Sequence, residues 1–211
     1  MRDGSQGRIG MAGAPRARAD LRVRVEEPGA TERVAQQVAH SLGRLGRPGL
    51  AILCIGTDRS TGDALGPLVG TLLTRGEALR ETQVRVLGTL DEPVHAGNLE
   101  RVLAGLAAER SSTTVVAIDA CLGRSENVGS ISVGTGPLQP GAGVNKTLPP
   151  VGDLFVTGTV NVGGFMEYFV LQNTRLSLVM RMAEIIASGL AAGVAAFLAA
   201  REAAAGRGSA G

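Results

Sequence analysis

Residues 50–67, LAILCIGTDRSTGDALGP, join an uninterrupted apolar run to a turn of small and polar residues. The run Leu50–Ile55 is short and apolar at every position, which predicts a fully buried strand. From Ala64 to about Thr74 the apolar residues return at helical spacing, which predicts a helix. The turn between them follows the carboxyl end of a strand, where open α/β sheets bind their ligands. We expect the chemistry of this protein to lie in that turn.

Periodicity divides the rest of the chain into further elements. The predicted strands are 21–25, 83–87, 114–119, 129–133 and 153–160, and the predicted helices are 31–45 with Thr31 as its cap, 98–109, a segment opened by Gly163 and Gly164, and 174–204. Strands and helices alternate between residues 50 and 119, the pattern of a parallel sheet with crossover helices. Residues 134–152 are rich in Gly and Pro and predict a long loop, which is either a lid or binding loop or a disordered segment.

The length of 211 residues suits one α/β domain with a proper core. We assign that domain to residues 21–205. Residues 1–20 are rich in Arg, Gly and Ala and lack periodicity, which predicts a disordered basic tail. Residues 206–211 are predicted to be a flexible end.

Composition narrows the partners and the compartment. The net charge of +2 and the aromatic content of 2% argue against a nucleic-acid partner. The longest uncharged apolar run, 185–200, is short for a membrane span, so we predict a buried helix and no membrane partner. Two cysteines, Cys54 and Cys121, do not make a disulfide framework, which favours the reducing cytoplasm. We interpret both as packed thiols.

Two acids follow predicted core strands. Asp63 lies in the turn after the first, and Asp119 ends the third, so both face one crevice if these strands are neighbours. A close pair of carboxylates can share one proton and activate water, or both can bind a divalent metal that does so. His95, after the second strand, is the candidate third group. No cofactor is predicted, and a metal at Asp63 and Asp119 stays open. The alternative for Asp63 is a helix cap.

Further residues are predicted to bind a substrate near the acids. Gly62 and Gly66 would let the substrate backbone approach the acids. The 134–152 loop and the 161–164 turn would line the cleft. The complete set of predicted substrate-binding residues is Gly62, Gly66, His95, Asn145, Lys146, Asn161 and Gly163.

Five segments resemble the YyaC family of sporulation proteins. They are IGTDRSTGDALGPLVG (55–70), GTLDEPVHAGNLE (88–100), AIDACLG (117–123), GAGVNKTLPPVGD (141–153) and VNVGGFMEYFVLQNTRLSLVMRMA (160–183). That family is similar to the germination protease of spore-formers, whose two catalytic aspartates lie in DALGP and AIDA motifs. The resemblance therefore implies catalytic roles for Asp63 and Asp119.

The resemblance also implies a fold and a substrate class. The fold is a three-layer αβα sandwich of phosphorylase/hydrolase type with a mostly parallel twisted sheet. The substrate is a peptide or protein, with small spore proteins as candidates. Hydrogenase maturation endopeptidases resemble this fold and bind a metal with two acids and a His, but their His follows the second acid and His95 precedes Asp119. Three hypotheses stand: a peptidase-like hydrolase using the two aspartates, a non-catalytic peptide- or protein-binding module, and a metal-dependent maturation-type endopeptidase.

Overall fold

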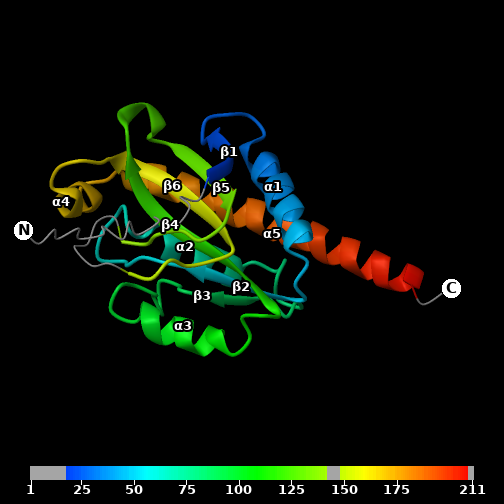
Figure 1. Cartoon of the computed structure of the whole chain (residues 1–211). Coiled ribbons are helices and arrows are strands. Elements are labelled where there is room, and N and C mark those ends of the chain that lie inside the picture. The colour runs from blue at the N-terminus through cyan, green and yellow to red at the C-terminus, as the bar shows by residue number, and fades with distance from the viewer. Residues whose placement is uncertain (1–17, 142–147, 209–211) are drawn as a thin grey trace, which may run out of the picture.

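A computed structural model describes residues 18–141 and 148–208, which form an α/β fold around one six-stranded sheet (Figure 1). The strand order is β1-β5-β6-β4-β2-β3. The strands are β1 (Arg18–Arg24), β2 (Gly49–Cys54), β3 (Arg85–Leu87), β4 (Thr113–Gly123), β5 (Ser130–Thr135) and β6 (Leu154–Val162). The apolar run in residues 50–55 is buried as predicted, and all of it except Ile55 lies in β2, between β4 and the edge strand β3.

The sheet is mixed, which corrects the prediction of a mostly parallel one. The pairs β2–β3, β2–β4 and β4–β6 are parallel, whereas β5 runs antiparallel to both β1 and β6. The cause is the connection 124–129 between β4 and β5, which holds only the 3-10 turn η1 (Ser125–Asn127). A parallel β5 would need a crossover of a dozen or more residues back to the far end of the sheet.

Helices cover both faces of the sheet. The helices are α1 (Ala30–Leu45), α2 (Leu65–Arg75), α3 (Leu99–Ala107), α4 (Glu167–Gln172) and α5 (Leu176–Gly208). The larger apolar core joins α1, α2 and α5 to one face, with Val34, Leu65 and Ile186 fully buried. The smaller core joins α3 to the other face through Leu99 and Leu106. In Figure 1, α3 and α5 lie on opposite sides of the strands.

Several predicted boundaries move. Arg18 to Asp20 belong to β1, so the predicted tail reaches three residues too far, and residues 1–17 lie outside the described residues. The predicted flexible end is wrong for residues 206–208, which continue α5, while 209–211 are not described. Thr31 does not cap α1, because that helix begins at Ala30 after Gly29, whose positive φ of 76° makes the turn.

Helix α5 is long and apolar enough to cross a membrane by length and composition, over Leu176–Arg207. Half of its most apolar window is buried inside the protein. The glycines at 189 and 193 let it approach α1, since a Cβ on Gly189 would lie 2.6 Å from Val34. Its C-terminal end projects beyond the sheet in Figure 1.

Candidate active site

The first acid lies in a turn that folds back over the end of β2. Gly56 adopts a φ of 142°, and a Cβ there would lie 2.0 Å from the Asp63 carbonyl oxygen. Because only glycine fits, the chain closes on itself, and the Thr57 N–H donates to that carbonyl at 3.2 Å. Asp63 precedes α2, whose N-cap is Ala64 and receives no side-chain cap bond. The capping alternative for Asp63 is therefore wrong.

The second acid lies on the neighbouring strand. β2 pairs in parallel with β4, with Cys54 opposite Ile118, so the turn after β2 lies beside Asp119. Asp119 is only 5% exposed, on the face that carries Ala117 toward α3. It does not end its strand as predicted, because β4 continues to Gly123. The adjacency on which the paired-acid prediction depended is confirmed.

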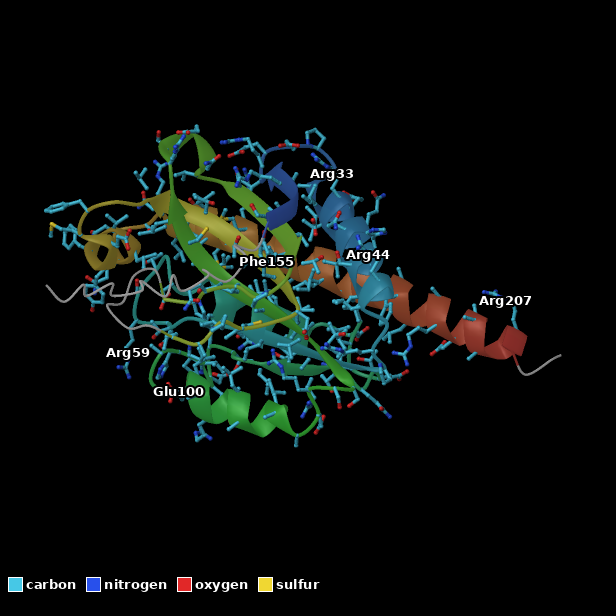
Figure 2. The ribbon with its side chains drawn as sticks, in the orientation of Figure 1. Arg33, Arg44, Arg59, Glu100, Phe155 and Arg207 are labelled. Carbon is cyan, nitrogen blue, oxygen red and sulfur yellow. The ribbon has the colours of Figure 1, made fainter. Side chains whose placement is uncertain are left out.

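Both acids line one cavity of about 310 Å³, together with His95. The remaining wall is largely apolar and includes Ile55, Leu122, Leu148 and Leu171. Arg59 also lines the cavity, and its side chain is exposed. In Figure 2 the Arg59 side chain lies at the periphery of the molecule, whereas Phe155 lies over the sheet. The cavity thus brings the carboxyl groups of Asp63 and Asp119 and the His95 imidazole into mainly apolar surroundings, and the exposed Asp58 adds a third carboxyl group to its wall.

These surroundings change the protonation of the pair. Burial raises the pKa of Asp119 well above its ordinary value, and the nearby Asp63 charge raises it further. N–H donation from Ala120 and Gly141 lowers this pKa and offsets part of the rise. Burial also raises the pKa of Asp63, while the Thr57 N–H and the His95 charge lower it. Two like charges in a poorly solvated site resist double ionisation. The pair therefore retains a proton more readily than isolated aspartates do, and Asp119 is the more strongly shifted member.

His95 is held by its own loop. The His95 backbone N–H donates to Asn98 Oδ1 at 2.8 Å, and Asn98 Nδ2 donates to the Pro93 carbonyl at 3.0 Å. Its Nδ1 accepts the Gly97 N–H at 3.0 Å, so the neutral ring carries its proton on Nε2. The preceding residue, Val94, bridges to Ile55 in parallel, which carries the imidazole to the cavity wall.

Ser60 is a polar cavity residue that the sequence reasoning missed. The residue is 8% exposed, and its Oγ is the one buried side-chain polar atom without a hydrogen-bond partner in the described part of the chain. An orphaned buried hydroxyl costs about 1–3 kcal/mol, and a ligand or a water that it binds would remove that cost. Its position three residues before Asp63 was the only signal in the sequence.

Among the predicted substrate-binding residues that the structure describes, His95 is the only one that lines the cavity. Gly62 and Gly66 serve close packing, since a Cβ would lie 2.8 Å from Leu171 and 2.1 Å from the Ile55 carbonyl oxygen, respectively. A Cβ on Gly163 would meet Leu122.

Asn161 joins β6 to α4 and to the segment that precedes α5, and it does not line the cavity. Its Nδ2 donates to the Val170 carbonyl at 3.3 Å and to Thr174 Oγ1 at 3.2 Å. Asn145 and Lys146, the predicted substrate-binding residues of the 134–152 loop, lie outside the described residues. Gly141 of the same loop does line the cavity.

Burial raises the pKa of Cys54 and Cys121, so both are protonated thiols at neutral pH, and Cys121 Sγ is 3.4 Å from Thr159 Oγ1. Among residues 18–141 and 148–208, no three His, Cys, Asp or Glu side chains cluster closely enough to hold a metal ion. The described site holds the acid pair Asp63 and Asp119, the His95 imidazole and the exposed carboxyl group of Asp58.

Comparison with known proteins finds a matching family and a similar protein. A family model described as "Protein of unknown function (DUF1256)" matches residues 22–189. A Bacillus subtilis (strain 168) protein, "Uncharacterized protein YyaC", is 50% identical over 174 residues, which are 75% of this chain and 83% of the relative. The predicted resemblance to the YyaC family is confirmed.

Proposed function

We propose a function for this chain, which belongs to the DUF1256 family, from the two acids that share its cavity. The proposed function is a peptidase-like hydrolase that activates water for attack on a peptide bond. The observation that carries it is the coupling of Asp63 and Asp119 in one largely apolar cavity, with raised pKa values for both. The finer fold proposal is a three-layer αβα sandwich of phosphorylase/hydrolase type, as the resemblance to the germination protease implies.

The environments of the two acids assign their roles. Asp119 is more deeply buried and feels the Asp63 charge, so it holds the shared proton and acts as the acid. Asp63 is stabilised as a carboxylate by the Thr57 N–H and by His95, so it acts as the base. This division leaves one ionised and one protonated carboxyl group beside a bound water.

The proposed step conserves protons. Asp63 takes a proton from the water as the water oxygen bonds to the carbonyl carbon, and Asp119 gives its proton to the carbonyl oxygen. The tetrahedral intermediate collapses as its C–N bond breaks, and the proton on Asp63 goes to the leaving amine. One hydroxyl of the intermediate returns its proton to Asp119, which restores the pair to its starting state.

Two further side chains support this chemistry. The orphaned Ser60 hydroxyl is a donor for the carbonyl oxygen of a bound substrate. The Nε2–H of His95 is a second donor in the same cavity.

The proposal also includes a substrate and a cellular compartment. The substrate is a polypeptide, with small spore proteins as candidates, and the compartment is the cytoplasm of the sporulating cell or the spore interior. These assignments rest on the resemblance to sporulation proteins. The proposal involves no nucleic acid and no membrane.

The test is hydrolysis of an unfolded polypeptide by the purified full chain, followed by mass spectrometry. We expect Asp63→Asn and Asp119→Asn each to lower the rate by at least about 1,000-fold, because each removes one half of a proton-transfer pair. Circular dichroism should show both variants folded. Asp91→Asn, an exposed aspartate outside the cavity, is the matched control and should cleave at the full rate.

Three results would overturn the proposal. Full activity in either cavity variant would remove the paired-acid mechanism. Activity that a chelator abolishes and that nickel or zinc restores would indicate the maturation-type endopeptidase instead. Binding of polypeptide without cleavage at any pH would leave a non-catalytic binding module.

A further inference from the structure

An apolar rim adjoins the candidate active site. It consists of Val162, Phe165, Met166, Tyr168 and Phe169, whose exposed fractions run from 43% to 81%. Three of the chain's five aromatic residues are in this rim, and the other two, Phe155 and Phe197, are buried. Scattered exposed apolar residues need no explanation, but a contiguous exposed group indicates a binding surface.

The rim is anchored to the loop that carries the first acid. The Gly62 N–H donates to the Leu171 carbonyl at 2.8 Å, and the Gly163 N–H donates to the Gly123 carbonyl at 2.8 Å. Within it, Met166 holds a positive φ of 49°, a conformation that is uncommon for a residue with a side chain. These bonds fix the backbone at Gly163 and Leu171, on the two sides of most of the rim, so the rim has a defined position beside the site.

The rim is continuous with the cavity. Tyr168 is a rim residue and lines the cavity beside Asp63 and Asp119, and Leu171, one turn further along α4, lines it from a buried position. An extended substrate whose reacting bond lies at the acids would therefore place neighbouring side chains against the rim. This continuity identifies the occupant as the substrate itself.

We propose that the rim is the specificity subsite of the hydrolase, and that it takes a bulky apolar side chain next to the reacting peptide bond. This inference rests on the proposed function and adds a substrate class to it: unfolded polypeptide segments carrying Leu, Met or Phe near the cleaved bond. The charges favour this occupant over an anionic membrane surface. Residues 162–176 contain one acid, Glu167, and one base, Arg175, and no basic cluster.

The test uses two matched sets of short, unstructured, fluorescent peptides, one with Leu or Phe at the centre and one with Ser there. Binding is measured by anisotropy on the Asp119→Asn variant, which does not consume the peptide, and cleavage is measured on the natural chain. We expect the apolar set to bind and to be cleaved in preference. Phe165→Ser and Tyr168→Ala should each weaken binding of the apolar set by about 10-fold and leave the serine set unchanged.

Leu176→Ser is the matched control, because Leu176 is 58% exposed and does not line the cavity. It should bind both sets as the parent does. Apolar preference without cleavage would support the rim and reject the hydrolase. Equal handling of both peptide sets, or no binding at millimolar peptide, would reject the rim. The proposal would also be rejected if the rim variants kept the peptide preference of the parent but lost a dimer or lost binding to anionic vesicles.

Discussion

Asp119 shows at the scale of one residue how burial serves chemistry at a cost in stability. Its carboxyl group is 5% exposed and lies within reach of the charge on Asp63. Ionising a buried acid beside another acid is unfavourable, so the folded chain holds this proton more tightly than the unfolded chain. Activity and stability should therefore respond in opposite directions to changes at this position.

The first prediction concerns pH and stability. The unfolded Asp119 releases its proton near its ordinary pKa of about 4, whereas the raised pKa retains it in the folded chain. The contribution of this acid to stability is then complete below about pH 4 and is lost as pH rises through the raised folded pKa. Asp119→Asn should remove this loss and raise the free energy of unfolding at pH 7 by about 1–2 kcal/mol.

Urea unfolding at a series of pH values measures this difference. Asp91→Asn should follow the parent curve at every pH, because Asp91 is exposed and outside the cavity. Parallel curves for the parent and Asp119→Asn would contradict the raised pKa of the folded chain.

The second residue-scale prediction separates a functional hydroxyl from a structural one. Ser60→Ala should raise the free energy of unfolding, by up to about 1–3 kcal/mol, because it removes an orphaned buried hydroxyl. It should also slow hydrolysis by about 100-fold through loss of a donor in the cavity. The measurements are urea unfolding and the polypeptide assay.

Ser41→Ala is the control for that change. Ser41 is also buried, but its Oγ accepts the Gln37 Nε2–H at 3.1 Å, so the change should cost about 1 kcal/mol and leave the rate intact. A destabilised but fully active Ser60→Ala variant would mean that the hydroxyl has only a structural role.

At the scale of elements, the position of α2 depends on glycines that face backbone. A Cβ on Gly66 would lie 2.1 Å from the Ile55 carbonyl oxygen, and one on Gly70 would lie 2.0 Å from the Gly88 carbonyl oxygen. The helix can thus lie directly against the ends of β2 and β3. Because Asp63 immediately precedes α2, this close approach also positions the acid.

The prediction at this scale is that Gly66→Ala lowers the free energy of unfolding by about 2–4 kcal/mol, because backbone cannot move aside as a side-chain tip can. Gly105→Ala provides the contrast. Gly105 lies in α3, is exposed, and has nothing within 4 Å of an added Cβ, so alanine there should add about 0.5–1 kcal/mol. Thermal unfolding of the two variants should move in opposite directions; equal effects would contradict this account.

At the scale of the whole molecule, α5 is a core helix for most of its length and a projection at its end. Met182, Ile186, Leu190 and Val194 are fully buried, and Phe197 is the last buried side chain of the helix. Leu198 is half-buried against the core, and residues 199–207 are exposed. Arg201 donates to the Pro48 carbonyl at 2.7 Å and lies over the Phe197 ring. The contact of the helix with the domain therefore ends near Arg201.

Truncation tests this boundary. Removal of residues 202–211 should leave the melting temperature nearly unchanged, because residues 202–207 are exposed. Removal of residues 194–211 deletes Val194 and Phe197 from the core and should cost several kcal/mol, about 3–5 for the Phe side chain alone. Circular dichroism melts of the two truncated chains measure the difference. A large loss from the shorter truncation would contradict the boundary.

The sequence by itself determined the local elements and the identity of the acids. The strand in residues 50–55, the helix after Asp63 and the glycine-dense turn between them follow from side-chain periodicity and turn chemistry, which act between near neighbours. The DALGP and AIDA motifs, which contain Asp63 and Asp119, were also identified from the sequence alone.

Only the tertiary structure decided which strands are neighbours. The pairing of β2 with β4 brings Asp63 beside Asp119, the reversed β5 makes the sheet mixed, and α4 supplies Tyr168 to the cavity wall. The glycines at 62 and 66 turned out to face packed atoms and not a ligand. These features depend on contacts between residues far apart in the chain, whose energies balance over the whole core and leave no periodic signal in any one segment.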